Sequence, residues 1–259
     1  MNLFTFDIET VPDTKTGRKL YALPVTMSEQ EVANIMQEKR KEKTGNDFLP
    51  LHLHRVVAIS VVLKAQNSFN IWSLGDCNSS EQEILQRFFT GIDKYTPTLI
   101  SYNGSGFDLP VLHYRALLHS VKAARYWEQG VNDQTFKWNN YINRYHDRHS
   151  DVMDILSCYQ PRATAPLDEV ASMLGFPGKM GMHGNKVWEN FLAGNIEAIR
   201  NYCETDVLNT YLIFLRFLLT QGKITQTEEK IYHQEIRDFL LKSGKEHLIN
   251  FNDHWAQNF

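Results

Sequence analysis

The residues that could carry chemistry begin near the N-terminus, in the segment FTFDIET at positions 4–10. Residues 3–8 are apolar enough to form a buried strand, in which side chains alternate between two faces. Asp7 and Glu9 therefore point the same way, roughly 7 Å apart along the backbone. Carboxylates at this spacing repel each other, and a divalent cation such as Mg²⁺ or Mn²⁺ relieves the repulsion. The alternative is a solvated pair of acids at a strand end.

Two further acids bear on that choice. Asp108 ends the glycine-rich segment NGSGFD (residues 103–108), a turn that runs into a helix. It is either an ordinary helix N-cap or a third carboxylate facing the first strand. Tyr202 and Asp206 lie four residues apart in an apolar helical stretch from Ile196 to about Gln221, so they share one helix face. The charge of Asp206 in such a segment needs a partner.

The elements that position these residues alternate between strands and helices. The pattern predicts strands at 55–63, 68–74 and 98–102, and helices at 28–43, 81–95 and 167–174, followed by two short C-terminal helices. Ser28 and Glu31 predict a capping box. The polar, charged region 13–50 is interpreted as an insertion between the first two strands.

Composition narrows the class of protein. The chain has 259 residues, is 42% hydrophobic and carries a formal net charge of −3, which argues against a broad duplex-coating surface. Its three cysteines are isolated, so we expect neither a zinc site nor a disulfide framework. Such cysteines suit a reducing compartment, so we expect a cytoplasmic location. We see neither a signal peptide nor a long apolar run, and we expect no membrane contact.

Three segments leave their role open. The lysines of the 13–50 insertion form either a solvated face or a nucleic-acid contact. Residues 122–149 interleave cations with aromatic rings, which suits either single-stranded nucleic acid or self-packing. The glycine-rich segment 175–186 carries two lysines and His183, and either touches phosphates or serves as a connection. His183 is not expected to bind a metal.

Together, these motifs resemble the DEDD 3′–5′ exonucleases of the ribonuclease H-like superfamily, in the class that carries a tyrosine. FDIET (residues 6–10) is similar to their first motif, and NGSGFD to the second motif of the proofreading domains of family B DNA polymerases. YCETD (residues 202–206) is similar to the third. Asn201 stands where the histidine class would have histidine. The resemblance covers about residues 1–220, and no polymerase segment follows.

The resemblance implies an α/β fold, with a ribonuclease H-like mixed five-stranded sheet flanked by helices and the first three strands antiparallel. It implies hydrolysis with two divalent cations, Mg²⁺ or Mn²⁺, held by Asp7, Glu9, Asp108 and Asp206. Asp7 would bridge both ions and Tyr202 would orient the attacking water. Asn103 and Phe107 are candidates for contact with the terminal nucleotide.

The expected substrate is therefore a single-stranded or frayed 3′ end, DNA favoured over RNA, and the product a nucleoside 5′-monophosphate. We expect an exonuclease domain at residues 1–222 and a C-terminal helical extension at 223–259. The alternative function is a catalytically silent nucleic-acid-binding module of the same fold, and a structure-specific endonuclease is a weaker one. The sequence does not show which protein partners, if any, the chain has.

Overall fold

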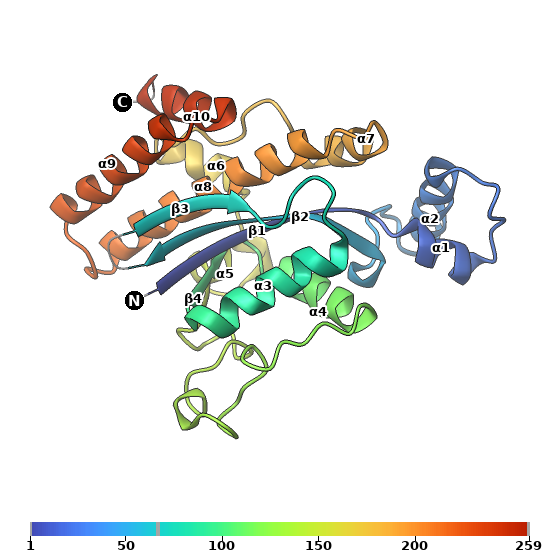
Figure 1. Ribbon diagram of the computed structural model, residues 1–259, viewed down its shortest axis with the longest axis horizontal. Helices are drawn as coiled ribbons and strands as arrows, with labels where there is room; N and C mark the ends of the chain where they lie inside the picture. Colours follow the sequence, from blue (N-terminus) through green and yellow to red (C-terminus); the bar gives the residue numbers. More distant parts are fainter. Residues whose placement is uncertain (1, 66–67, 258–259) are drawn as a thin grey trace.

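A five-stranded sheet forms the centre of the protein (Figure 1). The structure is a computed structural model and describes residues 2–65 and 68–257. Its strands are β1 Asn2–Pro12, β2 His54–Ala65, β3 Ser68–Ser73, β4 Thr98–Ser101 and β5 His149–Asp151. They lie in the order β3-β2-β1-β4-β5. β1, β2 and β3 are antiparallel neighbours, whereas β4 pairs parallel with both β1 and β5. The predicted mixed sheet is confirmed.

Helices cover both faces of the sheet, as the α/β prediction requires. They are α1 Thr14–Tyr21, α2 Glu29–Thr44, α3 Glu81–Tyr95, α4 Asp108–Leu118, α5 Val152–Leu156, α6 Leu167–Met173, α7 Val187–Leu192, α8 Ile196–Thr220, α9 Gln226–Lys242 and α10 Glu246–Gln257. Short 3-10 turns lie at Leu51–Leu53, Gln134–Phe136, Pro161–Ala163 and Gly184–Lys186. On one face, Phe4, Phe6 and Ile8 of β1 share a core with α3 and α4. On the other face, α8 crosses β1 and β2.

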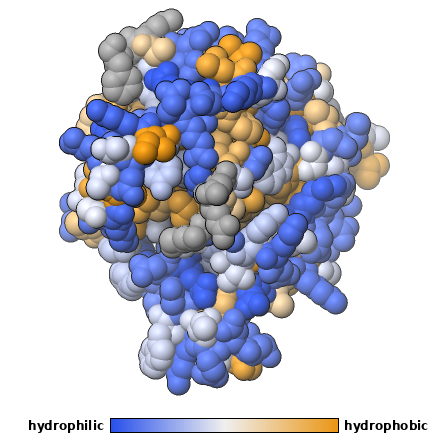
Figure 2. All heavy atoms as spheres, turned by 60° about the vertical axis from the view of Figure 1, so that its left-hand side comes forward, coloured by the Kyte–Doolittle hydropathy of each residue, from blue (hydrophilic) through white to orange (hydrophobic). Residues whose placement is uncertain are grey.

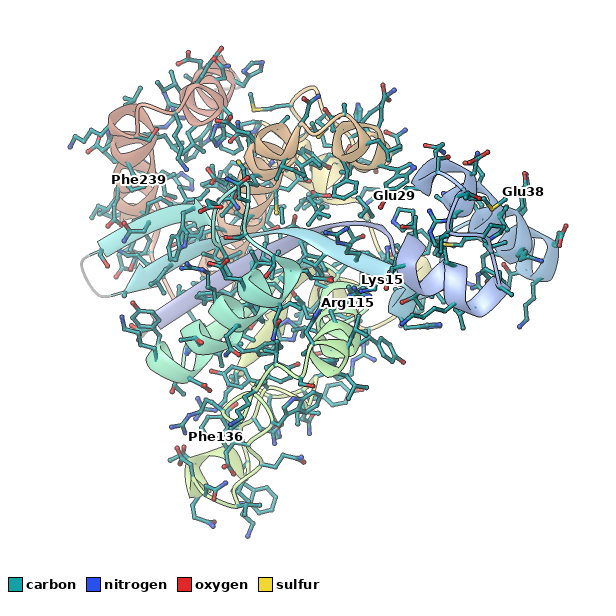
Figure 3. The ribbon with its side chains drawn as sticks, turned by 45° about the vertical axis from the view of Figure 1, so that its right-hand side comes forward. Lys15, Glu29, Glu38, Arg115, Phe136 and Phe239 are labelled. Atoms are coloured by element: carbon teal, nitrogen blue, oxygen red, sulfur yellow. The ribbon has the colours of Figure 1, made fainter. Side chains whose placement is uncertain are left out.

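The 13–50 insertion forms a helical arm, α1 and α2, which projects beyond the edge of the sheet (Figures 1 and 3). The capping box of Ser28 and Glu31 is present at the start of α2, as predicted, whereas α1 was not predicted. Arg115 of α4 fastens the base of the arm, because its guanidinium pairs with Asp13 and bidentately with Glu81 of α3. All three side chains are buried.

The C-terminal helices pack onto the main body of the molecule. Leu240 of α9 and Phe251 and Trp255 of α10 are fully buried in the core that also contains Leu208 and Tyr211 of α8. We find no helix in residues 2–65 and 68–257 that combines the length and the apolar character needed to cross a membrane.

Residues 122–149 form a long loop that hangs below the sheet in Figure 1. Its rings divide into two groups. Tyr126, Phe136 and Tyr141 are buried in the core, with the guanidinium of Arg148 3.7 Å from the centroid of Phe136. Trp127, Trp138 and Tyr145 are exposed. Self-packing therefore accounts for half of the aromatic pattern, and the exposed rings remain available to a ligand.

Candidate active site

The predicted acids come together where β1, α4 and α8 meet. Asp7 and Glu9 lie on β1, whose neighbours β2 and β4 fix it from both sides. Asp108 is the first residue of α4, and Asp206 lies within α8. Glu9, Asp108 and Asp206 are 8%, 5% and 7% exposed. Asp7 is partly buried, so residues nearly 200 positions apart form one largely buried group of carboxylates.

This proximity changes the protonation of the acids. Burial raises the pKa of the Asp7 carboxyl well above its ordinary value, and the charges of Asp108 and Asp206 raise it further. The pKa of Glu9 is raised by burial and then by Asp7 and Asp206. Burial brings the pKa of Asp108 to about 7 and that of Asp206 to about 6. The cluster thus holds more negative charge than its surroundings can neutralise.

Two details of the cluster fit a hard cation. Within the described part of the chain, Oδ1 of Asp206 is buried and has no hydrogen-bond partner. Carboxylate oxygens of Asp7 and Glu9 lie within 4.8 Å of each other. A buried carboxylate oxygen without a donor is costly, and a divalent cation is the partner that such oxygens prefer. The site residues therefore fit the expected metal ions.

Cys203 is a site residue that the sequence analysis missed. Its thiol is fully buried and lies 3.4 Å from the carbonyl oxygen of Asp7 and 3.5 Å from its Oδ2. Burial raises the pKa of the thiol, and the charges of Asp7 and Glu9 raise it further. The thiol therefore stays protonated and donates a hydrogen bond to Asp7. Its spacing of three residues from Asp206 on α8 could have revealed it, because such residues share a helix face.

Asp108 is held in place by the turn before it and does not act as a cap. The N-cap position of α4 is Phe107, and no side-chain capping bond occurs there within the described chain. The capping interpretation of Asp108 was therefore wrong, which leaves its carboxylate free to face β1. Gly104 and Gly106 make the turn compact. A Cβ at position 104 would lie 2.2 Å from Ser101 Oγ, and a Cβ at position 106 would lie 2.5 Å from Asn103 Oδ1.

Asp151 at the end of β5 fixes this turn. Its two carboxylate oxygens accept hydrogen bonds from the backbone N–H groups of Asn103, at 2.9 Å, and Ser105, at 2.8 Å. Asn103 itself has a left-handed φ of 65° and an exposed side chain. Asp151 also occupies the N-cap of α5. Asp154 pairs with Arg144 at 2.6 Å.

Tyr202 lies on α8 one turn before Asp206 and is 7% exposed. Burial, then the charges of Asp206 and Glu9, raises the pKa of its hydroxyl above the ordinary value of 10.0. The phenol therefore keeps its proton at any physiological pH and can only donate or orient.

A lysine from the glycine-rich segment also reaches the cluster. The charge of Lys179 lowers the pKa values of Glu9 and Asp206, and its Nζ lies 3.6 Å from Asp168. Asn209 of α8 holds the segment, accepting from Gly178 N–H at 3.1 Å and donating to its carbonyl at 2.9 Å. The glycine-rich segment stood out in the sequence, whereas Asn209 did not. His183, which was not expected to bind a metal, is exposed.

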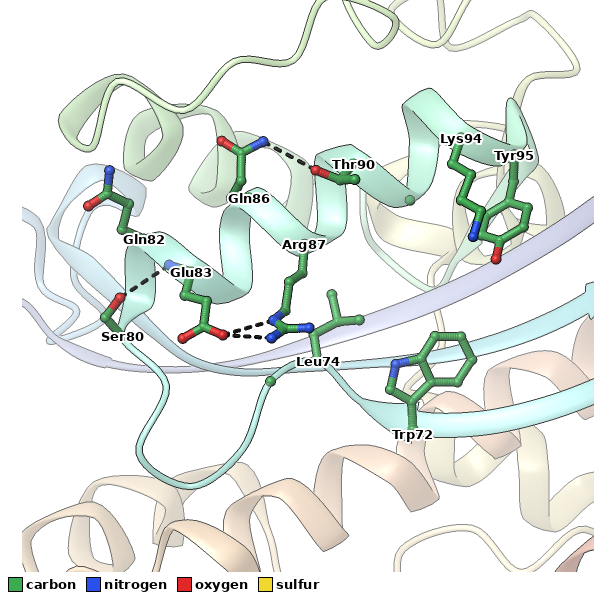
Figure 4. Close-up of a pocket in the computed structure, with 12 residues that line it drawn as sticks. Trp72, Leu74, Ser80, Gln82, Glu83, Gln86, Arg87, Thr90, Lys94 and Tyr95 are labelled. Atoms are coloured by element: carbon green, nitrogen blue, oxygen red, sulfur yellow. Dashed lines mark hydrogen bonds and ion pairs between the residues drawn. The ribbon is translucent and has the colours of Figure 1, made fainter.

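Other hollows lie away from the acids. A groove of about 740 Å³ runs between α3 and β3, where Trp72 faces Lys94 and Tyr95 (Figure 4). An apolar hollow of about 510 Å³ lies beside the C-terminal end of α8, on the side that Figure 2 brings forward. None of the predicted site residues lines either of them.

Comparison with known families agrees with this geometry. Residues 46–255 match the family described as a predicted 3′-5′ exonuclease related to the exonuclease domain of PolB. The chain belongs to this family. It is a 3′–5′ exonuclease of ribonuclease H-like fold, and its substrate is a nucleic acid. No curated protein matches the exonuclease.

Proposed function

We propose that the exonuclease removes nucleotides one at a time from single-stranded or frayed 3′ ends, with DNA favoured over RNA, and releases nucleoside 5′-monophosphates. The observation that carries the proposal is the largely buried group of Asp7, Glu9, Asp108 and Asp206, whose mutual repulsion bound divalent cations would relieve. The relation to PolB, whose name is that of a DNA polymerase, supports the preference for DNA. The exonuclease would fall in the tyrosine-bearing DEDD class.

Two divalent cations, Mg²⁺ or Mn²⁺, are the proposed cofactors, and the four acids would hold them. When bound, such ions lower the pKa of water and neutralise the charge that develops on the phosphate and the leaving oxygen. The structure supports this assignment through the unpartnered oxygen of Asp206.

The chain's own residues position the reaction. Water attacks the phosphorus of the terminal phosphodiester, the bond from phosphorus to the 3′ oxygen breaks, and the shortened strand leaves with a 3′-hydroxyl. Tyr202, which keeps its proton, orients the attacking water. Lys179 faces the phosphate, because its charge already acts on Glu9 and Asp206. Asn103 and Phe107 contact the terminal nucleotide from the turn before Asp108.

A silent binding module of the same fold is the second candidate. Clustered negative charge opposes phosphate binding, so a module that only bound nucleic acid would gain nothing from buried acids at this place. We therefore favour the enzyme.

The test is a time course on matched DNA and RNA single strands labelled at the 5′ end, with Mg²⁺, Mn²⁺ or EDTA. We expect a metal-dependent ladder that shortens from the 3′ end, faster on DNA, and no ladder with Asp7→Ala. A circular single strand should stay intact, because only an endonuclease cuts one. Absence of cleavage under every metal, with binding retained, would establish the silent module.

We also propose the division of the chain into an exonuclease domain, residues 1–222, and a C-terminal helical extension, residues 223–259. The boundary falls between α8 and α9, and the extension covers α8 with a shared core. The free thiols of Cys77, Cys158 and Cys203 support a cytoplasmic location, because a reducing compartment keeps thiols reduced.

A further inference from the structure

Phe48 is an exposed aromatic residue at the rim of the acid cluster. It lies in the segment that leads from the helical arm back to β2, and its side chain is 53% exposed. Its ring nevertheless has neighbours, because the centroid lies 5.1 Å from that of His54 and 5.9 Å from that of Phe107. One face of the ring is thus supported while much of it remains open to solvent.

The support beneath Phe48 is rigid. His54 is buried, and its ring nitrogens lie 2.9 Å from Thr10 Oγ1 and 3.1 Å from the carbonyl oxygen of Leu49. Its ring meets that of Phe107 edge to face, at 5.2 Å and an interplanar angle of 89°. Three aromatic rings therefore form one cluster, which we call the Phe48 platform: Phe48, His54 and Phe107.

The Phe48 platform borders the acids through two chain connections. Phe107 directly precedes Asp108, and Thr10, which contacts His54, directly follows Glu9. A strand whose terminal phosphate reached the acids would bring its last bases to this rim. Aromatic rings beside a phosphate site are what unpaired bases stack on.

The helical arm holds the backbone of Phe48 in place. Arg40 of α2 donates through Nε to the carbonyl oxygen of Phe48 at 3.2 Å, and the N–H of Phe48 donates to Asn46 Oδ1 at 2.8 Å. The arm, which projects away from the body in Figure 3, thus has a structural connection to the active-site rim.

We propose that the Phe48 platform stacks a base near the 3′ end of the bound strand, and that the helical arm positions it. The proposal rests on the proposed function, since it takes an unpaired strand as the ligand. It assigns the 13–50 insertion a role in binding through Phe48, independent of the charge of its lysines.

The test measures binding without cleavage, in an Asp7→Asn background, by fluorescence anisotropy with a short oligothymidylate. Removing a base–aromatic stack weakens binding by about tenfold, so we expect Phe48→Ala to raise the dissociation constant by about that factor. Phe48→Trp should restore binding. Leu241→Ala is the matched control, since Leu241 is 54% exposed and belongs to α9, a helix that lies far from the arm in Figure 1. This substitution should leave binding unchanged.

A second oligonucleotide separates stacking from a structural effect. It keeps every phosphate but lacks the bases of its last three nucleotides. We expect the parent and the Phe48→Ala variant to bind this strand equally. The proposal would be overturned if Phe48→Ala weakened the binding of both oligonucleotides equally. It would also be overturned if the substitution left the binding of the intact oligonucleotide unchanged. Because no cleavage is measured, a Phe48-dependent preference for bases would survive even if the protein proved to be a silent module.

Discussion

At the scale of single residues, Asp7 illustrates a conflict between stability and function. Its partly buried carboxylate lies among other acids, so Asp7→Asn removes a repulsion and, with it, a proposed metal ligand. We expect the variant to be inactive yet more stable than the wild type at pH 8 without metal, by about 1–2 kcal/mol. Chemical denaturation with and without Mg²⁺ tests this, and Mg²⁺ should stabilise the wild type more.

The pH dependence of that difference follows from the same pKa values. Asp108 and Asp206 titrate at about 7 and about 6 in the folded protein, against 3.8 for the ordinary carboxyl. The folded state therefore binds protons more tightly than the unfolded chain does. The stability that this proton binding contributes at low pH is lost as the pH rises toward 7. The advantage of Asp7→Asn should accordingly shrink at pH 5. An advantage independent of pH would contradict the electrostatic explanation.

Tyr202 yields a prediction about mechanism. Because the pKa of its hydroxyl is raised, we expect Tyr202 to orient water as a neutral phenol and not to act as a base. Tyr202→Phe should lower kcat about 100-fold while KM changes little. The loss should be the same from pH 6 to pH 9, measured as initial rates on a single-stranded oligonucleotide. A loss that grew steadily with pH would indicate that the phenolate is the active form.

At the scale of elements, the turn before α4 depends on β5, a strand that carries none of the four predicted acids. Asp151 of β5 accepts backbone hydrogen bonds from Asn103 and Ser105, and so orients the start of α4. Asp151→Asn turns one acceptor into a donor that faces an N–H group. We expect a stability loss of about 1–3 kcal/mol and a lower kcat, with binding of the strand less affected. Unchanged kcat would show that the turn needs no such support.

The elements also show what sequence patterns can and cannot predict. α3 was predicted with its bounds because Ser80 caps a clear amphipathic repeat, and the box of Ser28 and Glu31 marked the start of α2. α1 was missed because eight residues with a glycine give too short a pattern, and its start depends on Asp13, which also pairs with distant Arg115.

The same limit applies to the site. The sequence predicts five candidate site residues because local motifs contain them: Asp7, Glu9, Asp108, Tyr202 and Asp206. The contacts of Cys203 with Asp7 and of Asn209 with Gly178 were not, because they join segments whose approach only the folded chain determines. The sequence left Asp108 as either a helix cap or a third carboxylate, and the fold excludes the cap because Phe107 occupies that position.

At the scale of the whole molecule, Glu204 joins the sheet, α8 and the C-terminal extension. Its buried carboxylate accepts from the backbone N–H of Ser73 at 2.9 Å, and it pairs with Lys245 at 2.9 Å and with His247 at 2.8 Å. Although burial opposes ionisation, the hydrogen bonds from His247 and Lys245 lower the pKa of Glu204 to about 2. The residue is thus ionised throughout the physiological range.

Glu204→Gln should therefore destabilise the whole fold. A pKa lowered from 4.5 to about 2 contributes stability above pH 4.5, which is lost as the pH falls toward 2. Because Lys245 is half-exposed, we expect Glu204→Gln to lower the free energy of unfolding by only about 2 kcal/mol at pH 7. Urea denaturation should show a smaller difference from the wild type at pH 3. Glu189→Gln, which removes the exposed pair with Lys186, should change stability by less than about 0.5 kcal/mol. A gap for Glu204→Gln that stayed constant between pH 7 and pH 3 would mean that packing, and not its charge, holds the C-terminal helices on α8.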